Sequence, residues 1–179
     1  MALRFKDAEG MAFPDDMMVA NALAPFGLSS NRILETLRSF VSVTEFVPNS
    51  RYTEKLASEL EKHLRRALVG GDIREAVDGT YSPRLNERAD LVLATRGKEE
   101  RLFFEIEFRP NVEKDLIKFQ IGHNARRLAA AVLLLSSDRD SINPGYTTMP
   151  EFGKFVELIR ELGPSYPLFV CGVTGQHFA

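Results

Sequence analysis

Residues 88–108, RADLVLATRGKEERLFFEIEF, constrain the fold more than any other part of the chain. Residues 89–95 are rich in Leu, Val and Thr, and residues 101–108 alternate between apolar and acidic side chains in their last part. Between them, residues 96–100 are polar and contain a glycine. Two extended runs that flank such a turn are typical of a β-hairpin. The sequence therefore predicts two antiparallel strands here.

The second strand of this hairpin has two different faces. Successive side chains of a strand point to opposite sides, so Phe104, Ile106 and Phe108 share one face. Glu105 and Glu107 share the other face. Two carboxylates on an otherwise apolar strand raise the free energy of the fold if they are buried without a partner. We therefore expect a positive charge beside them.

Asp90, at the start of the first strand, is a third candidate for the same place. If the hairpin register brings it opposite Glu105 and Glu107, three carboxylates surround one point. Carboxylate oxygens are the ligands that a hard divalent cation such as Mg²⁺ prefers. The alternative is a solvated strand edge, because E-x-E is also common on surface strands, and spacing alone leaves both interpretations open.

The order of the remaining elements predicts the fold class. Helical periodicity is present in residues 29–41, 53–69, 112–128 and 149–162, and residues 129–136 and 167–173 are apolar runs of strand length. A helix between two buried strands favours an α/β (α+β) fold with a mixed central β-sheet flanked by helices. We expect one domain over residues 1–179, with an N-terminal helical extension in residues 1–50 and the core in residues 53–173.

Composition limits the class of protein. The chain has 179 residues, a net charge of −2 and one cysteine, Cys171, which excludes an intrachain disulfide framework. It has no basic–apolar leader and no apolar run of about 18 residues, so we expect a soluble cytoplasmic protein without a membrane partner. Residues 51–130 hold 16 Lys and Arg against 14 Asp and Glu. This local excess favours an anionic substrate, although the whole chain has no basic field.

Further site candidates lie on the two helices beside the hairpin. Glu61 is at the edge of the apolar stripe of residues 53–69 and could reach a site on the sheet; a surface position is the alternative. Glu54 and Glu59 compete with it for the same role. On the helix after the hairpin, three polar side chains could contact phosphate or could simply be solvated: Lys114, Lys118 and Gln120.

Asp90, followed by Glu105-Ile106-Glu107, a helix and an apolar strand, resembles the PD-(D/E)XK nuclease superfamily, and within it the BamHI and BglII type restriction endonucleases. The run FFEIEFRPNVEKDLIKFQIGHNARRLAAAVLLL is the most similar part, and the resemblance covers about residues 53–173. It implies a restriction-endonuclease-like core. Most members have a lysine that positions or activates the attacking water at the place of Glu107, so this chain departs from the common pattern there.

The resemblance implies an Mg²⁺-dependent endonuclease that hydrolyses phosphodiester bonds of double-stranded DNA, with Mn²⁺ as a possible substitute. Asp90 and Glu105 would hold the metal, Glu107 would orient or deprotonate the water, and Glu61 would be an accessory glutamate. Lys114, Lys118 and Gln120 would contact DNA, and the protein would be a homodimer.

Two other functions are compatible with the sequence. One is a catalytically inactive nuclease-fold protein that binds DNA or a partner without cutting it. The other is a small α/β partner-binding domain in which the acidic strand is only a surface. The inactive nuclease-fold protein would bind DNA but show no metal-dependent cleavage. The partner-binding domain would bind neither DNA nor Mg²⁺.

Overall fold

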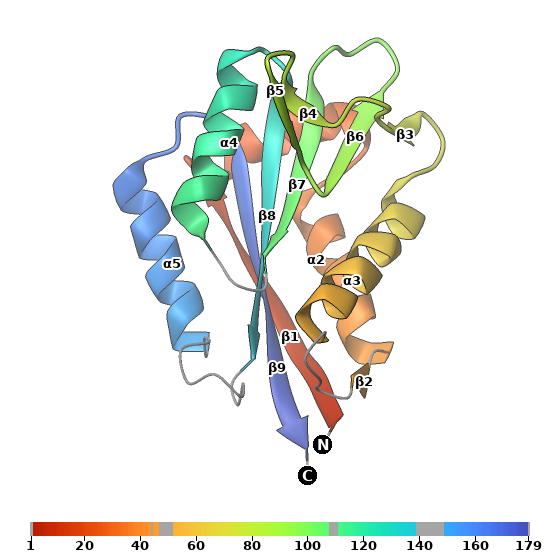
Figure 1. The fold of residues 1–179 in the computed structure, drawn as a ribbon, viewed down its shortest axis with the longest axis vertical. Coiled ribbons are helices and arrows are strands. Elements are labelled where there is room, and N and C mark those ends of the chain that lie inside the picture. Colours follow the sequence, from red (N-terminus) through yellow and green to blue (C-terminus); the bar gives the residue numbers. More distant parts are fainter. Residues whose placement is uncertain (1, 44, 47–51, 108–110, 139–148, 179) are drawn as a thin grey trace.

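The computed structural model describes the backbone of residues 2–43, 45–46, 52–107, 111–138 and 149–178, and the side chains of residues 8–40, 58–107, 111–135 and 152–172. The strands of its main sheet are β1 (Ala2–Phe13), β2 (Glu45–Phe46), β3 (Ile73–Glu75), β6 (Leu91–Thr95), β7 (Arg101–Glu107), β8 (Leu128–Asp138) and β9 (Leu168–Phe178). Within the described residues this sheet has seven strands in the order β2-β1-β9-β8-β7-β6-β3 (Figure 1).

The sheet is mixed. Its central strands β7, β8 and β9 are parallel to one another, and β1 and β6 join them antiparallel on either side. β8 lies between two parallel neighbours, and its residues 130–135 are all buried. This confirms the predicted α/β fold with a mixed central sheet, and also the predicted apolar strand that is covered on both faces.

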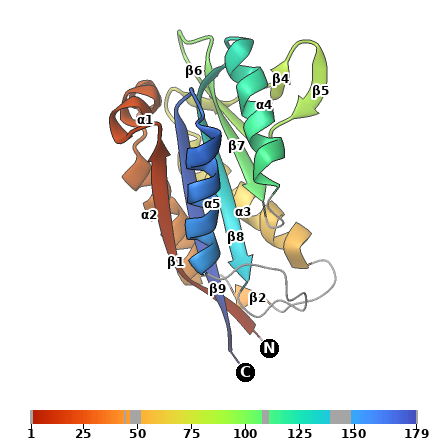
Figure 2. The same cartoon turned by 90° about the vertical axis from the view of Figure 1, so that its left-hand side faces the viewer.

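Helices cover both faces of the sheet (Figures 1 and 2). One face carries α1 (Asp16–Leu23), the short 3₁₀ helix η1 (Ala24–Phe26), α2 (Ser30–Val43) and α3 (Tyr52–Leu68). The other face carries α4 (Val112–Asn124) and α5 (Met149–Leu162). The helices predicted in residues 29–41, 53–69 and 149–162 are confirmed. Among the described residues, no helix combines the length and the apolar composition that crossing a membrane requires.

The face under α1, α2 and α3 is an apolar core. The Ser29 hydroxyl caps α2 by accepting a hydrogen bond from the Arg32 backbone N–H at 3.1 Å. The two longer helices then present buried side chains one turn apart towards the sheet. The buried residues that form this core include Ile33, Leu37, Leu60, Leu64, Phe104, Ile106, Val132 and Cys171. Burial of each large aliphatic side chain contributes about 1.5–3 kcal/mol.

The face under α4 and α5 has a second apolar core. Its buried residues include Phe103, Leu116, Phe119, Leu133, Val156, Ile159 and Val170. Phe103 and Phe104 therefore enter different cores, as the alternation of a strand requires. Both faces of β7 are covered, so a polar side chain on either face of its inner part is removed from water.

The first fifty residues contain a strand of the main sheet in addition to the predicted helices. α1 and α2 are helices, but β1 pairs with β9 over its whole length and lies inside the sheet. The sequence of β1 lacks a regular alternation, and the β1–β9 register shifts between Phe5 and Asp7. A bulge of this kind interrupts the period of two that identifies a strand, which is why β1 was not predicted.

The helix predicted in residues 112–128 is shorter than expected. α4 ends at Asn124, and Arg126 adopts a left-handed backbone conformation with φ of 54°. The backbone N–H of Arg127 donates to the carbonyl of Gly122 at 2.9 Å and closes the last turn. Leu128 consequently begins β8 instead of ending the helix.

The hairpin of β6 and β7 has the register that the acidic site requires. Leu91 pairs with Phe104 in an antiparallel register, so Asp90, the residue before β6, comes level with Glu105. The Asp90 carboxylate accepts a hydrogen bond from the Ile106 backbone N–H at 2.7 Å. The predicted hairpin is confirmed, although Phe108, expected on the apolar face, lies outside the described residues.

Candidate metal centre

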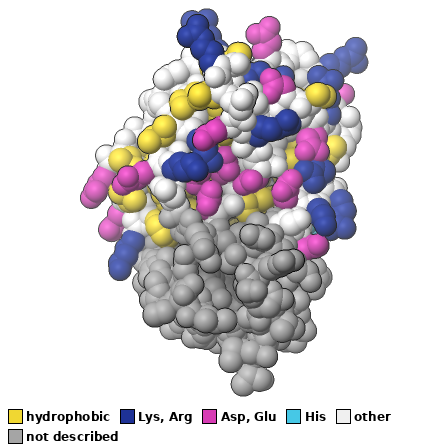
Figure 3. All heavy atoms as spheres, in the orientation of Figure 1, with side chains coloured by type: hydrophobic (Ala, Val, Ile, Leu, Met, Phe, Trp, Pro, Cys, Tyr) yellow, Lys and Arg dark blue, Asp and Glu magenta, His cyan; other side chains and the backbone are white. Residues whose placement is uncertain are grey.

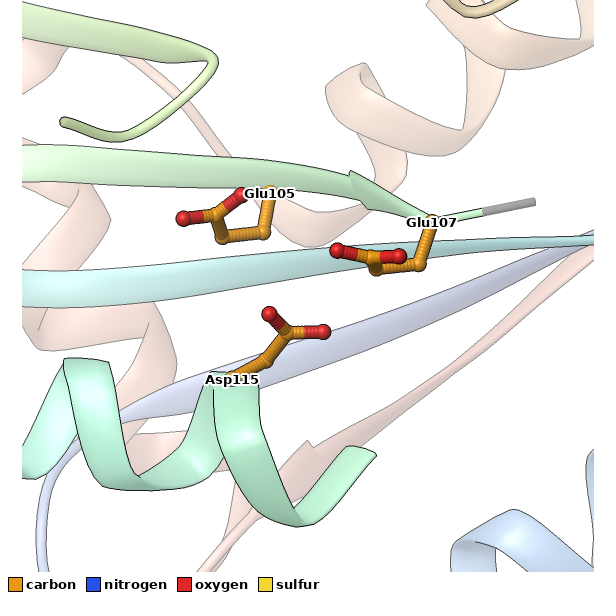
Figure 4. Close-up of side chains that lie close together, drawn as sticks. All are labelled: Glu105, Glu107 and Asp115. Carbon is orange, nitrogen blue, oxygen red and sulfur yellow. The ribbon is translucent and has the colours of Figure 1, made fainter. Parts of the chain in front are cut away.

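Three carboxyl groups converge between β7 and α4. Figure 4 shows Glu105 and Glu107 extending from β7 on the side that faces α4, and Asp115 pointing from α4 towards the sheet. One carboxylate oxygen from each residue lies within 4.8 Å of the others. We call these three residues the acidic cluster. The predicted convergence of Glu105 and Glu107 is present, and Asp115 is an additional member.

The acidic cluster is mostly shielded from water. Glu105 is 3% exposed, Asp115 is 0% exposed, and Glu107 is half-buried. Asp115 is in the first turn of α4, where the helix dipole favours a negative charge. The side chain of Asn111 fixes the start of this helix by accepting a hydrogen bond from the Lys114 backbone N–H at 3.2 Å. Local capping and strand alternation thus both direct carboxylates into one small space.

Lys118 supplies a positive charge to the acidic cluster. Its ammonium group lies 3.3 Å from Glu105 Oε1 and 3.4 Å from Asp115 Oδ1. Lys118 is one turn after Asp115 on α4, so both side chains face β7. It was predicted to contact DNA phosphate, but in this structure its ammonium group binds two carboxylates. The expectation that a positive charge accompanies the acidic strand is met by this lysine.

Tyr81 donates a second hydrogen bond to Glu105. Its hydroxyl lies 2.5 Å from Glu105 Oε1, and the side chain is 1% exposed. When Glu105 is ionised this contact is a charge-assisted hydrogen bond, about twice as strong as a neutral one. Tyr81 and Lys118 both bind Oε1, and the other oxygen, Oε2, receives neither bond.

Burial raises the pKa of every carboxyl group in the acidic cluster. The pKa of Glu105 rises to about 8, mainly because burial disfavours the charged form, with the nearby charge of Asp90 adding to it. The Tyr81 hydrogen bond and the Lys118 charge oppose that rise. The pKa of Glu107 rises to about 7 through burial and the charge of Asp115. Burial also raises the pKa of Asp115. A site that holds several acids and one lysine therefore retains protons near neutral pH.

One buried oxygen of the acidic cluster has no donor. No N–H group and no hydroxyl of the described residues binds Asp115 Oδ2, although the atom is buried. The Asp115 carboxyl instead contacts that of Glu107, and two carboxylates come this close only with a proton or a cation between them. Buried polar atoms without a partner are rare and need an explanation such as a missing ion. A hard divalent cation fits this place, because all three residues offer carboxylate oxygens. Glu105, Glu107 and Asp115 are the residues that would hold it.

Asp90, predicted as a metal ligand, lies at the edge of the acidic cluster. It is exposed to solvent, and its Oδ2 atom is bound to the backbone of β7. Its charge is close enough to raise the pKa of Glu105, Glu107 and Asp115. The Asp90 carboxyl is in hydrogen-bond range of Glu105, although the group of three with mutually close oxygens is Glu105, Glu107 and Asp115.

The predicted helix glutamates lie on α3. The carboxylate of Glu61 accepts a hydrogen bond from the Arg65 guanidinium at 2.7 Å, and the same guanidinium binds Glu75 of β3. Glu59 pairs with Lys62 at 3.4 Å. The side chain of Glu54 lies outside the described residues. Among the described carboxylates, neither Glu61 nor Glu59 belongs to the acidic cluster.

The three residues predicted to contact DNA differ in exposure and in their partners. Lys114 is exposed on α4, whereas Lys118 is directed into the acidic cluster. The Gln120 amide donates to Asn124 Oδ1 at 2.9 Å. Gln120 also lines a groove of about 350 Å³ between α4 and the segment that follows α5. On the face drawn in Figure 3, basic and acidic side chains are interspersed over the described part of the molecule.

Asp115 and Tyr81 were missed as site residues for different reasons. Asp115 was not among the candidates chosen from the sequence. Its signal was present, because it occupies a position of the buried stripe formed by Val112, Leu116 and Phe119, where an acid is out of place. Tyr81 has no comparable signal, since only the three-dimensional fold brings its turn-like segment beside β7.

Buried carboxylates around an unpartnered oxygen, with one lysine beside them, define a candidate divalent-cation centre on a mixed α/β sheet. No protein-family model matches the chain, and no curated protein sequence matches it. Among solved structures, the chain is similar to the crystal structure of free BglII. The TM-score is 0.48 at 8% sequence identity, and the similarity covers 93% of this chain and 79% of that one.

Proposed function

We propose that this protein is a divalent-metal-dependent endonuclease that hydrolyses phosphodiester bonds in double-stranded DNA. The observation that carries the proposal is the buried acidic cluster of Glu105, Glu107 and Asp115 with the ammonium group of Lys118 against it. The resemblance of Asp90 and Glu105-Ile106-Glu107 to the PD-(D/E)XK superfamily supports DNA as the substrate. Asp90 and the three carboxyl groups of the acidic cluster share one lysine. Buried acids with too few positive partners lower the stability of a fold, so a fold-stabilising role alone does not account for them.

The acidic cluster would hold Mg²⁺, or Mn²⁺ in its place. When bound, the metal would lower the pKa of a coordinated water and neutralise charge on the scissile phosphate. Asp90, at the edge of the cluster, extends the set of carboxylates towards solvent. The ligands proposed from sequence, Asp90 and Glu105, therefore become part of a larger set that includes Glu107 and Asp115.

Glu107 is the proposed general base. It is the most accessible carboxyl group of the acidic cluster, so a water at the site can approach it from solvent. The attacking water would give its proton to Glu107 as its oxygen bonds to phosphorus. The bond from phosphorus to the 3′ oxygen would break, and that oxygen would take a proton from solvent. The products would have 5′-phosphate and 3′-hydroxyl ends, as the sequence resemblance implies.

Lys118 is the proposed electrostatic partner of the reaction. Burial lowers the pKa of its ammonium group, but the charges of Glu105 and Asp115 outweigh that effect, so the pKa is raised and the group stays protonated. Most members of the superfamily have a lysine at the position of Glu107, and here α4 supplies a lysine to the same carboxylates from the neighbouring element. Its ammonium group would hold the water or a phosphate oxygen beside Glu105.

The proposal also includes contacts with the DNA backbone and a homodimer. Lys114 is exposed near the start of α4 and is the better candidate for contact with DNA phosphates away from the scissile one, because Lys118 is engaged in the acidic cluster. Such contacts position the duplex without reading its sequence. A homodimer, implied by the sequence resemblance, would place two acidic clusters on opposite strands of one duplex.

The test is cleavage of supercoiled plasmid by the purified protein with Mg²⁺, Mn²⁺ or EDTA. Glu105→Gln, Asp115→Asn and Lys118→Met each keep the approximate side-chain volume and remove one charge. We expect each to reduce cleavage by about 100-fold or more. Glu99→Gln, in the exposed turn between β6 and β7, is the matched control and retains full cleavage.

The outcome separates the three functions considered from the sequence. Metal-dependent cleavage that the three substitutions abolish supports the nuclease. DNA binding without cleavage under any metal condition favours the inactive nuclease-fold protein. If the folded protein binds neither DNA nor metal, the acidic cluster is a feature of the scaffold and the proposed function is wrong.

A further inference from the structure

A small two-stranded sheet adjoins the acidic cluster. Its strands are β4 (Thr80–Ser82) and β5 (Leu85–Arg88), which pair antiparallel and are separate from the main sheet. We call residues 78–88 the β4–β5 arm, which Figure 1 shows beside α4 and β6. The arm is largely exposed, but Tyr81 is buried beneath it. One residue of an exposed element is therefore inserted into the interior beside the carboxylates.

The ring of Tyr81 occupies a closely fitted place. It stacks on Phe103 of β7 with ring centres 4.9 Å apart and meets Phe119 of α4 edge-on at 6.0 Å. Gly122 of α4 leaves space for it, because a Cβ atom at that position would lie 3.2 Å from Tyr81 Cδ1. Three sides of the ring are thus fixed by β7 and α4, the two elements that carry the acidic cluster.

The hydroxyl of Tyr81 has one described acceptor, the Oε1 atom of Glu105 at 2.5 Å. The Lys118 ammonium group binds the same oxygen at 3.3 Å. Two donors on one oxygen fix the rotation of the carboxylate and direct Oε2 away from them. Because packing holds the ring in place, the hydroxyl keeps the Glu105 carboxylate in one orientation.

The arm that carries Tyr81 is attached to the far end of α4. The Arg127 guanidinium lies 2.7 Å from Asp78 Oδ2 and donates to the hydroxyl and carbonyl oxygens of Thr80 at 2.9 and 3.1 Å. Arg101 of β7 donates to the Asp78 carbonyl. Hydrogen bonds from Thr80, with help from Arg127, hold the pKa of Asp78 well below its usual range, so this attachment persists at neutral pH.

We propose that Tyr81 is a positioning residue of the metal site, which orients the Glu105 carboxylate for cation binding, and that the β4–β5 arm serves to hold it there. The inference rests on the proposed function only in requiring that the acidic cluster binds a divalent cation. A purely structural tyrosine would fill the same space without affecting that binding.

Tyr166 provides a matched control. It is also 1% exposed, and its ring also meets Phe119, with ring centres 6.2 Å apart. Its hydroxyl donates to the Leu116 backbone carbonyl at 3.1 Å instead of to a carboxylate. Tyr81→Phe and Tyr166→Phe therefore remove the same atom from similar surroundings, and only the first removes a hydrogen bond to the acidic cluster.

The experiment is calorimetric titration of the full chain with Mn²⁺, together with thermal unfolding of the metal-free protein. We expect Tyr81→Phe to weaken Mn²⁺ binding by about 10- to 100-fold, the range typical of residues that orient a ligand. Tyr166→Phe leaves the affinity unchanged. In a Glu105→Gln background, adding Tyr81→Phe produces no further loss, because Tyr81 acts through Glu105. Equal affinity in Tyr81→Phe and wild type, or equal loss in both tyrosine variants, overturns the inference.

Two further outcomes are also decisive. If Tyr81→Phe does not fold, Arg127→Gln replaces it, since this change releases the arm and keeps the ring and hydroxyl. Weakened Mn²⁺ binding in folded Arg127→Gln supports the inference, and unchanged binding overturns it. If the wild-type protein binds no Mn²⁺, the proposed function itself fails, and Tyr81 is then a core residue only.

Discussion

The two faces of β7 are both buried but are built differently. On one face, Phe104 and Ile106 enter an apolar core beneath α2 and α3. On the other face, Glu105 is equally shielded, yet it faces a carboxylate, a lysine and a tyrosine hydroxyl. Adjacent residues of one strand are thus equally buried, but one has apolar surroundings and the next has charged and polar surroundings. The apolar face stabilises the fold, whereas the acidic face holds charge at the expense of stability.

This contrast shows what each face is suited to do. An apolar core gains stability from every side chain that it buries, and nothing in it requires a ligand. The acidic face leaves Asp115 Oδ2 without a donor and raises the pKa values of its carboxyl groups. These are the properties of a site that is completed by a cation. The comparison therefore predicts that the two faces respond differently to substitution, pH and metal.

The largest effect is expected on the apolar face. Phe104→Ala removes a fully buried ring and leaves a cavity, so the free energy of unfolding should fall by about 3–5 kcal/mol. Urea denaturation of the metal-free protein measures it. Mn²⁺ affinity of the remaining folded protein should change little, because the ring lies on the opposite side of the strand. A loss below about 1 kcal/mol would mean that this face is not the main source of stability.

The acidic face should make stability depend on pH. The pKa of Glu105 is raised in the folded protein, so folding retains a proton there that the unfolded chain releases above its ordinary pKa of 4.5. Stability is therefore fully present below that value and is lost as pH rises towards about 8. We expect a decrease of about 2 kcal/mol or more between pH 5 and pH 8 in EDTA. Urea denaturation at several pH values tests this, with Glu105→Gln as the variant whose dependence is weaker.

Metal binding should release protons. The carboxyl groups with pKa values of about 7 and 8 are partly protonated at pH 6.5, and a cation displaces those protons. Mn²⁺ affinity should rise with pH, by about tenfold per unit for each proton displaced. Calorimetric titration in two buffers with different ionisation enthalpies gives the number of protons. Affinity that is constant from pH 6 to pH 8 would argue against cation binding by the acidic cluster.

The smallest effect is expected at a surface ion pair that belongs to neither face. Glu75 of β3 binds Arg65 of α3 at 2.7 Å, and its side chain is 43% exposed. Glu75→Gln should lower the free energy of unfolding by about 0.5 kcal/mol, because solvent screens such pairs. Urea denaturation in low and high salt measures this loss. A loss as large as that of Phe104→Ala would remove the distinction between buried and exposed contributions.

Local sequence patterns predicted much of this fold. The alternation in residues 101–107 gave the correct strand and the correct face for Glu105 and Glu107. Helical periodicity located α2, α3 and α5, and an uninterrupted apolar run located β8. Each of these signals is contained within one element. For that reason they could be recognised without knowing how the elements pack.

The features that were not predicted depend on contacts between distant parts of the chain. β1 is a strand through its pairing with β9, at the other end of the sequence, and a bulge obscures its local pattern. Tyr81 reaches Glu105 from the β4–β5 arm, which Arg127 and Arg101 contact at Asp78. Asp115 is the intermediate case. Its position in a buried helical stripe was visible, but the identity of its partners required the packing of α4 on β7.

The central claim is that Glu105, Glu107 and Asp115 together form a divalent-cation site. The most direct test is an anomalous diffraction map from crystals of the full chain soaked in Mn²⁺. We predict a Mn²⁺ peak in contact with carboxylate oxygens of all three residues, including Asp115 Oδ2. A peak held by other carboxylates, or no peak while Glu105 and Asp115 remain paired with Lys118, would contradict the claim.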